Sequence, residues 1–393
     1  MDFFRILIVI LFLIFSYLYL CRSFHIIFGL KRKSYIYITL AIFMFLANLG
    51  FWGSRYFRGQ GSIPYQFEYI YWVSFILLGF MFFMLSCFFI ADIFSIIIYF
   101  IHKIISFKKT KKSENLNKER RRILHFISLG IAACFTGVAY VNARRIPQVK
   151  EVFVPIKNLH DELKDFSIVQ LTDLHIGQTI GKEYVEAVVE KVNLLNADIV
   201  VITGDLIDGF VEQIQDWVKP LSNIKAKYGI YYVTGNHEYY WDAEGWVKYI
   251  QSLGIHYLGN SNHLLNIGKS KVVICGVNDL SAEKFIESHK MDLEKSKNNA
   301  PQFPHLKILL AHQPNTAFEA VKLNYFDLQI SGHTHGGQIW PMTWLIHFIQ
   351  YFRPGLTAFQ DMYVYVSRGT GYWGPPARLG SDSEITFLKI KQV

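Results

Sequence analysis

Residues 198–205 read DIVVITGD, a β-branched run that ends in a glycine and a carboxylate. Such an apolar run is typical of a strand buried on both faces of a parallel sheet. Residues 166–172 and 230–234 form similar runs, and residues 182–195 place Val185, Val188, Val192 and Leu195 on one helical face. This alternation of strands and helices predicts α/β architecture from about residue 150 onward.

Polar side chains follow three of these runs at the point where each strand is expected to end. Asp173 and His175 follow the first, Asp205 follows the second, and Asn236 and His237 follow the third. The spacings of 32 residues from Asp173 to Asp205 and 31 from Asp205 to Asn236 suit one strand-helix-strand crossover each. Open α/β sheets place their sites at the carboxyl ends of strands, so these side chains are expected to converge.

Two more strand-like runs end in histidine. Residues 306–311 lead to His312, and residues 328–331 lead to Gly332, His333 and His335. One histidine after a strand is as often structural as functional, but five such endings in one chain favour a site. Glycines flank these residues where the backbone must turn sharply off a strand, at Gly204, Gly235, Gly332, Gly336 and Gly337.

The ordered set D-x-H, G-D, G-N-H-E, a single H and G-H-x-H resembles the signature of calcineurin-like metallophosphoesterases. The resemblance covers approximately residues 150–393 and is closest to the membrane-anchored branch, the transmembrane proteins with a metallophosphoesterase domain. Residues 333–341 and the tail from 365–371 through 384–386 are also similar to that branch. The resemblance implies a four-layer α/β/β/α sandwich of two sheets flanked by helices.

The resemblance also implies a role for each strand-end residue. Asp173, His175 and His335 would hold a first metal ion, Asn236, His312 and His333 a second, and Asp205 would bridge the two. His237 would be the proton donor or a transition-state hydrogen-bond donor. Oxygen and imidazole ligands without thiolate suit two divalent or trivalent ions of Mn, Fe or Zn, and leave the choice among them open.

The expected activity is metal-dependent hydrolysis of a phosphoester by a hydroxide bridging two metal ions. A phosphodiester or diphosphate is favoured over a phosphomonoester because of the membrane setting, and a lipid-linked substrate is one option. A nuclease or nucleotide diphosphatase with the same metals is an alternative. A second alternative is a non-catalytic membrane receptor or transporter-like module with a metal-binding outer domain, although the spans contain no cluster of intramembrane charges that would suggest a pathway, apart from Asp92 near an interface.

Residues 1–145 are much more apolar than the remainder and predict a transmembrane region. Crossing the hydrocarbon takes roughly 20 helical residues, and the apolar stretches lie at about 4–21, 35–52, 69–90 and 123–141. The third stretch continues apolar to Ile101 and contains Asp92, which therefore lies either at the interface or against protein. The hydrolase domain is expected over residues 150–393.

Basic residues in the short loops predict the orientation, since such loops stay in the cytoplasm. The loop between the second and third stretches has only Arg55 and Arg58, whereas the loops before and after it are rich in Lys and Arg: Arg22, Lys31, Arg32 and Lys33, then Lys103, Lys108, Lys109, Lys111, Lys112, Lys118, Arg120, Arg121 and Arg122. We therefore predict a multi-pass protein of the cytoplasmic membrane with an extracytoplasmic catalytic domain.

Arg144 and Arg145, which follow the fourth apolar stretch, argue weakly against this orientation. Residues 119–122 resemble a twin-arginine export signal with a cleavage site near 141–143, but three preceding stretches favour a retained helix. The formal charge of +9 is explained by these loops, so the bilayer is an expected partner and nucleic acid is not.

Residues 339–352 read IWPMTWLIHFIQYF, which is unusually apolar for a segment beside a hydrolytic site. Two interpretations stay open: a membrane-facing helix, or a helix packed on the core of its own domain. Tyr239, Tyr240 and Trp241 either line a pocket or pack. The remaining aspartates in strand and turn positions are expected to be surface or turn residues rather than ligands, namely Asp198, Asp208, Asp279 and Asp327.

Overall fold

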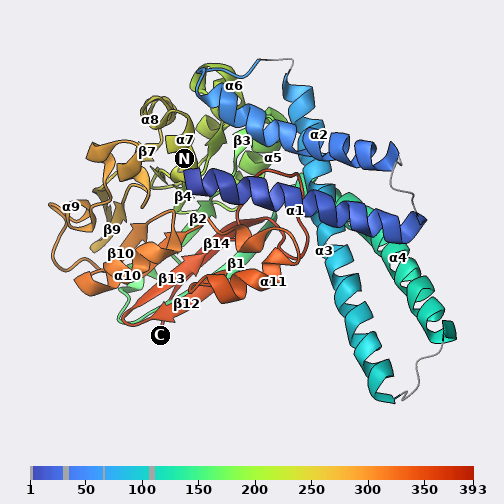
Figure 1. The fold of residues 1–393 in the computed structure, drawn as a ribbon. Helices are drawn as coiled ribbons and strands as arrows, with labels where there is room; N and C mark the ends of the chain where they lie inside the picture. Colours follow the sequence, from blue (N-terminus) through green and yellow to red (C-terminus); the bar gives the residue numbers. More distant parts are fainter. Residues whose placement is uncertain (1–2, 30–34, 65–66, 106–110) are drawn as a thin grey trace. The chain divides into compact units, whose positions relative to one another are not determined.

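The structure, a computed structural model, describes residues 3–29, 35–64, 67–105 and 111–393 (Figure 1). The chain divides into two units, each described by itself. The first, the helical unit, comprises Met1–Tyr56, Tyr65–Val141 and Gly374–Ala377, and the second, the catalytic unit, comprises Phe57–Pro64, Asn142–Trp373 and Arg378–Val393. Five of the basic loop residues used for orientation lie outside the described residues, namely Lys31, Arg32, Lys33, Lys108 and Lys109.

Four long helices carry the apolar stretches of the N-terminal region. They are α1 (Phe3–Phe28), α2 (Tyr35–Arg58), α3 (Phe67–Ile105) and α4 (Lys111–Arg144). All four are long and apolar enough to cross a membrane. The predicted all-helical region with four long apolar helices is therefore confirmed. Helices α2 and α3 approach closely at a small residue, where the Gly50 amide donates to Ser74 Oγ at 2.6 Å.

The catalytic unit contains two six-stranded mixed sheets. The first has the order β1 (Gln148–Ile156), β14 (Glu384–Gln392), β2 (Ser167–Leu171), β4 (Ile199–Thr203), β6 (Ile230–Val233) and β7 (His256–Tyr257). The second has the order β12 (Gly355–Phe359), β13 (Met362–Val366), β11 (Leu328–Ser331), β10 (Leu306–Leu310), β9 (Ser270–Gly276) and β8 (Ser261–Ile267). A small parallel pair joins β3 (Ile176–Gly177) to β5 (Ile207–Asp208).

The predicted crossovers are present in the first sheet. Strands β2 and β4 are parallel with Ile168 opposite Ile199, and β4 and β6 are parallel with Val200 opposite Ile230. Helix α5 (Lys182–Asn193) connects β2 to β4 and buries the predicted face, Val185, Val188 and Val192. The strand-end residues thus emerge along one edge, because parallel strands end on the same side of a sheet.

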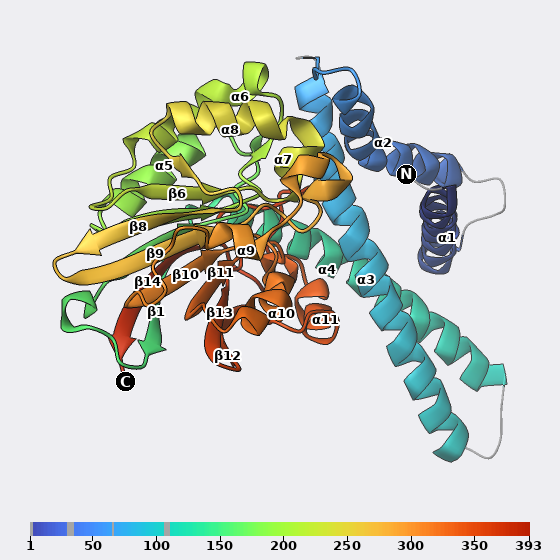
Figure 2. The same cartoon turned by 90° about the vertical axis from the view of Figure 1, so that its left-hand side faces the viewer.

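Helices cover the outer face of each sheet. Figure 2 shows α5, α6 (Val211–Val218) and α8 (Ala243–Ser252) along the first sheet. The second sheet packs its outer face against α9 (Leu293–Ser296) and α10 (Ala317–Ala320), with Leu293, Ala317 and Ala320 buried among the strand residues Val273 and Leu309. A short helix, α7 (Asn236–Trp241), begins directly at the strand-end residue Asn236.

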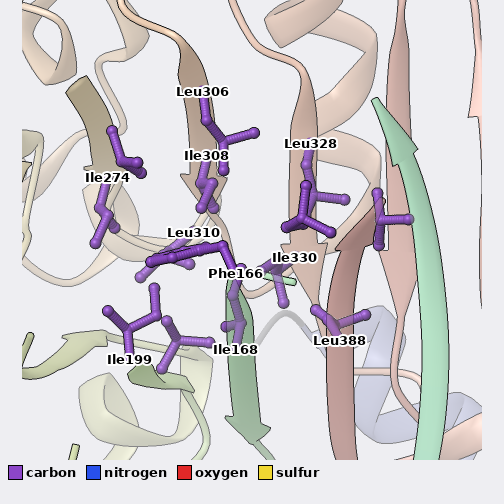
Figure 3. Close-up of a cluster of buried hydrophobic side chains, with 14 of the residues drawn as sticks. Phe166, Ile168, Ile199, Ile274, Leu306, Ile308, Leu310, Leu328, Ile330 and Leu388 are labelled. Carbon is purple, nitrogen blue, oxygen red and sulfur yellow. The ribbon is translucent and has the colours of Figure 1, made fainter. Parts of the chain in front are cut away.

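The core lies between the inner faces of the two sheets (Figure 3). Phe166, Ile168 and Ile199 from the side of the first sheet meet side chains of the second that are fully buried, including Leu306, Ile308, Leu310, Leu328 and Ile330. Alternation along each strand sends every second residue into this layer. Two sheets with helices outside each confirm the predicted α/β/β/α sandwich.

Residues 339–352 contain helix α11 (Met342–Ile349), which follows the turn of His335–Gly337. The large apolar residues of α11 are mostly exposed, with Trp344 59% and Phe348 73% accessible. Phe352, beyond the helix, is buried in the core of the second sheet. The segment therefore divides between the two interpretations: its end packs on the domain, while its helix presents an apolar surface.

The inner layer predicts a contrast between two leucine truncations. Leu306→Ala should lower the free energy of unfolding by about 2–5 kcal/mol, because it leaves a cavity between the sheets. Leu194→Ala is the matched control, since Leu194 is 79% exposed, and should change stability by less than about 0.5 kcal/mol. Denaturant titration of the full-length protein in detergent measures both. Equal stability of the two variants would contradict the assigned core.

Candidate metal centre

The seven residues predicted from the sequence as metal ligands lie together where strands of both sheets end. In the first sheet, Asp173 and His175 follow β2, Asp205 follows β4 and Asn236 follows β6, while in the second His312 follows β10, and His333 and His335 follow β11. Six of the seven side chains are buried and His333 is partly buried. The sandwich therefore brings together residues up to 162 positions apart in the chain.

Asp173, His175 and His335 form one compact group. One ligand atom from each lies within 4.8 Å of the others. The Nε2 atoms of His175 and His335 are 3.0 Å apart, and His335 Nε2 lies 3.5 Å from Asp173 Oδ1. Two imidazole nitrogens and a carboxylate oxygen so close together could contact a single cation.

Asp205, His312 and His333 form a second group with ligand atoms within 4.8 Å of one another. His312 Nε2 lies 3.3 Å from Asp205 Oδ2 and 3.2 Å from His333 Nδ1. His312 Nδ1 donates to the Thr203 carbonyl at 2.8 Å, which leaves Nε2 free for a ligand. Asn236 Oδ1 is buried without a hydrogen-bond partner among the described residues. A buried orphan acceptor of this kind fits a cation.

Asp205 belongs to the second group and lies close to one member of the first. Its Oδ2 atom lies 3.3 Å from His312 Nε2 in the second group and 3.8 Å from His175 Nε2 in the first. Its Oδ1 atom accepts from the His237 amide at 2.8 Å, which fixes the orientation of the carboxylate. One oxygen thus faces the space shared by the two groups.

The backbone at this site is strained. Five of the seven residues have positive φ although they carry side chains: Asp173, His175, Asp205, His333 and His335, with φ between 49° and 73°. Such conformations cost roughly 1 kcal/mol or more each and persist only where the surroundings enforce them. Strain concentrated on the ligand residues, one strand end after another, marks this edge as a functional site.

Two glycines allow the close approach that this arrangement needs. A Cβ atom on Gly235 would lie 2.3 Å from Asp205 Oδ1, and one on Gly332 would lie 2.2 Å from Asp173 Oδ2. Neither carboxylate could stay in place beside a larger residue. The glycines predicted from the sequence to flank the ligands are therefore required sterically at these two positions.

Asp208 was expected to be a surface or turn residue, and that prediction is wrong. Its side chain is only 13% exposed and accepts from His175 Nδ1 at 3.1 Å, from His237 Nδ1 at 2.5 Å and from Trp241 Nε1 at 3.1 Å. The pairing of β5 with β3 places Asp208 beside the first strand end. Asp208 therefore orients two site imidazoles at once.

Two further buried residues support the ligands, and no role for either was predicted from the sequence. Glu238 accepts from the amides of Gly235, Asp205 and Leu206 at 2.7, 3.2 and 2.7 Å, which ties the second strand end to the third. The fully buried Arg378 places its Nη2 atom 3.1 Å from His335 Nδ1 and donates to the Arg368 carbonyl at 2.8 Å. Glu238 is the last residue of the G-N-H-E motif, whereas Arg378 lies outside the five metal-ligand motifs.

The site holds Asp205 as an anionic carboxylate and His335 as a neutral imidazole. Burial favours the neutral form of Asp205, yet the neighbouring His312 and His237 hold its pKa well below the ordinary value. Burial, Arg378 and His175 together lower the pKa of His335 well below that of a free imidazole. The neutral imidazole and the carboxylate are the forms that bind metal ions.

His237 has the opposite protonation. Burial lowers its pKa, but the carboxylates of Asp208 and Asp205 outweigh burial and raise the pKa to about 9. Its Nδ1 atom faces Asp208, and its Nε2 atom lies 3.9 Å from Asp205 Oδ2. His237 is therefore held with a proton pointing toward the space between the two groups.

An α/β sandwich that gathers carboxylates, an asparagine and histidines at its strand ends defines the class of metal-dependent phosphoester hydrolases. The chain belongs to the calcineurin-like phosphoesterase family, whose model matches residues 166–337. All seven predicted ligands and His237 lie within that range. The resemblance drawn from the motifs, and with it the prediction of a metallophosphoesterase, is confirmed.

Relatives with membrane helices are among the similar proteins. The chain is 39% identical over 273 residues to a transmembrane protein with metallophosphoesterase domain from Danio rerio, covering 68% of this chain and 62% of that relative. It is 34% identical over 301 residues to a protein of the same description from Bos taurus, covering 74% and 68%. An uncharacterized metallophosphoesterase of Helicobacter pylori is 35% identical over 288 residues, covering 71% and 74%. The chain thus spans less than two thirds of the Danio rerio protein.

Asp208 contacts two imidazoles of the site, so replacing it should reduce function although Asp208 is not one of the predicted ligands. Asp208→Asn removes the charge that orients His175 and His237, so we expect metal affinity to fall by about 10–100-fold and turnover to fall with it. Metal titration of hydrolysis by the purified full-length protein measures this. Asp216→Asn, at an exposed carboxylate on α6, should behave as the unsubstituted protein. Asp208→Asn with normal affinity and turnover would refute the orienting role.

Proposed function

We propose that the chain hydrolyses phosphoesters with two metal ions held at the strand ends described above. The observation that carries this proposal is Asp205 Oδ2, which lies within 3.8 Å of imidazole nitrogens in both ligand groups. A carboxylate shared by two groups suits a pair of ions more closely than one. Mn, Fe and Zn all fit the oxygen and nitrogen donors.

Each residue has a stated part in this proposal. Asp173, His175 and His335 hold the first ion, and Asn236, His312 and His333 hold the second, with Asp205 in contact with both. Paired ions supply an activated water nucleophile and neutralise charge on the phosphoryl group. Asp208, Glu238 and the strained turns hold the side chains of the metal ligands in their orientations.

His237 serves as the proton donor to the leaving oxygen. Its Nδ1 atom is held by Asp208 at 2.5 Å, so the imidazole cannot turn away from the site. The pKa of about 9 keeps a proton on the ring at neutral pH. Bound metal ions would add positive charge beside His237 and so lower its pKa toward neutrality, which would ease transfer of this proton.

A phosphodiester or diphosphate, with a lipid-linked compound favoured, is the proposed substrate class. Helix α11 begins within seven residues of His335 and exposes Trp344, Phe348 and Ile349. Trp373, 46% exposed, has its ring 5.8 Å from that of His237. Exposed aromatic residues beside a polar site support a substrate with an apolar part.

We also propose that the catalytic unit lies on the extracytoplasmic side of the cytoplasmic membrane. Residues 57–64 connect α2 to α3 in sequence, in the loop with few basic residues, and they belong to the catalytic unit. The Ile63 amide donates to Gln213 Oε1 at 3.0 Å, and Gln213 Nε2 donates to the Ile63 carbonyl at 2.7 Å. A loop and a domain in contact share one side of a membrane, which supports the orientation predicted from the basic loops.

Arg144, which argued weakly against that orientation, has a local role in the catalytic unit. Its Nη1 atom donates to the Thr179 carbonyl at 2.8 Å. An arginine held by a backbone carbonyl of a folded domain is less informative about topology than one in a free loop. This contact therefore weakens Arg144 as an argument against the extracytoplasmic assignment.

Removal of a ligand tests the activity directly. Asp205→Ala and His335→Ala should each lower turnover of a generic phosphodiester by more than about 100-fold, because ligands matter at least as much as the residues that orient them. Chelation should abolish the activity of the unsubstituted protein, and Mn²⁺ or Zn²⁺ should restore it. Circular dichroism establishes that the variants stay folded. Near-normal rates in both folded variants would remove the catalytic proposal.

A substrate panel separates the alternatives. Full-length protein in detergent is assayed with lipid phosphates, nucleotide sugars, short oligonucleotides and simple diesters. Preference for oligonucleotides or nucleotide sugars would favour the nuclease or nucleotide diphosphatase alternative. Metal binding without hydrolysis of any compound would favour the non-catalytic one.

Arg58, the last residue of α2, brings a cation to the same site. Its guanidinium lies 4.5 Å from the centre of the Trp241 ring and 5.3 Å from that of Tyr240, whose ring is 4.9 Å from His237. Such stacking holds the charge in a fixed position. We infer that Arg58 attracts the anionic group of the substrate.

Arg58→Gln should therefore raise KM by roughly 5–10-fold, the size expected for a charged contact in a partly exposed site, with a smaller change in kcat. Steady-state kinetics measure the two separately. Arg55→Gln is the matched control, because Arg55 is exposed on the same helix and should leave KM unchanged. Equal KM values for the two variants would exclude Arg58 from substrate binding.

A further inference from the structure

A buried carboxylate joins three helices of the helical unit. Asp92 on α3 is 8% exposed and accepts from both terminal nitrogens of Arg22 on α1, at 2.6 and 3.3 Å. It also accepts from Tyr19 Oη at 2.8 Å and from Arg121 Nη2 on α4 at 2.9 Å. Of the two positions left open by the sequence, Asp92 faces protein. Its charge is compensated by two arginines, so Asp92 by itself needs no ligand.

The surroundings of Asp92 carry more positive charge than this carboxylate balances. A cavity of about 410 Å³ is lined from α1, α3 and α4 by Arg22, Asp92, Ser95, Ile96, Tyr99, Asn117, Lys118, Arg120 and Arg121. Four of these residues are cationic and one is anionic, which leaves a surplus of three positive charges. The Nε atoms of Arg120 and Arg121 are buried without a hydrogen-bond partner among the described residues. A cavity with these properties favours an anion.

The chemistry of the lining identifies the kind of anion. Guanidinium groups match phosphate oxygens with paired, charge-assisted hydrogen bonds, and Lys118 adds a further donor. The wall from α3 also has an apolar side, where Ile96 is 55% exposed and its neighbours Ile93 and Phe94 are 40% and 55% exposed. A phosphate attached to acyl chains meets both kinds of surface, whereas a free phosphate meets only one.

We propose that this cavity binds the phosphate headgroup of an anionic phospholipid. Arg22 on α1, and Lys118, Arg120 and Arg121 on α4, are among the basic residues from which the orientation was predicted. The lipid therefore belongs to the leaflet on their side, which the orientation rule makes the cytoplasmic one. The bound headgroup neutralises the surplus cations and holds α1, α3 and α4 together around Asp92. This site is separate from the metal centre and does not depend on the proposed activity.

The test uses full-length protein in nanodiscs of phosphatidylcholine, with or without phosphatidylglycerol. Native mass spectrometry counts retained anionic lipid for the unsubstituted protein and for the double variant Lys118→Gln/Arg120→Gln, which keeps every printed partner of Asp92. We expect retention to fall by about 10-fold or more in the double variant, because two charge-assisted contacts are lost. Arg55→Gln, with the same kind of charge change outside the cavity, should retain lipid normally.

Two further arms decide the source of the phosphate and the cause of any loss. The charge-conserving double variant Lys118→Arg/Arg120→Lys should restore retention, which separates a charge effect from misfolding. Inorganic phosphate added to phosphatidylcholine nanodiscs should not raise the unfolding temperature, whereas phosphatidylglycerol should. Equal retention by Lys118→Gln/Arg120→Gln and the unsubstituted protein would overturn the site, and equal stabilisation by free phosphate would overturn the lipid assignment.

Discussion

The catalytic unit depends on the position of one carboxylate oxygen, Asp205 Oδ2. It reaches imidazole nitrogens in both ligand groups, at 3.3 Å to His312 and 3.8 Å to His175. His312 comes from the second sheet and His175 from the first, so the carboxylate can take this position only if both sheets pack at the observed spacing. The apolar layer between the sheets, nearly all of it fully buried, provides that spacing. The packing of the core therefore determines the geometry of the site.

The strained turns follow from the same requirement. A strand delivers its last residues along its own axis, yet a ligand must turn toward the neighbouring sheet within one or two residues. Positive φ at Asp173, Asp205 and His333 achieves that turn, at a cost that the hydrogen bonds beneath the site offset. Glu238 illustrates the compensation, since its carboxylate accepts from three amides of two successive strand ends. The strain is local, and the support comes from residues in other turns.

The sequence predicted the residues of the site better than it predicted their supports. Apolar runs that end in Asp, Asn or His are recognisable in the sequence, because a buried strand requires apolar residues and a metal ligand requires a polar one. Asp208 has no such pattern: it lies three residues after Asp205, and only the pairing of β5 with β3 brings it to two imidazoles. Arg378 is a stronger case, because its contact with His335 spans 43 positions that include α11, β12 and β13. Contacts of this kind depend on the whole fold, and no periodic pattern in the sequence predicts them.

Helix α11 shows a different limit. Its composition indicated an apolar segment, but composition does not distinguish a helix that packs from one that faces a bilayer. The structure separates them by residue: Phe352 enters the core, and Phe348 stays 73% exposed. That exposure costs roughly 1.5–3 kcal/mol for each large side chain in water, a cost that a lipid surface removes. The exposed face of α11 therefore supports the proposed substrate with an apolar part, and the buried end of the segment does not.

The two polar clusters of the chain differ in how their buried groups are balanced. At the strand ends, the carboxylates of Asp173, Asp205 and Asp208 lie beside imidazoles, of which His237 holds a proton and His335 is neutral. The buried Asn236 Oδ1 has no hydrogen-bond partner among the described residues. Around Asp92, four cations meet a single carboxylate, and the excess is positive. A polar or charged group removed from water needs a partner, and a partner that the chain does not provide has to be a ligand. The donor types at the strand ends therefore fit cations, and the surplus charge around Asp92 fits a phosphate.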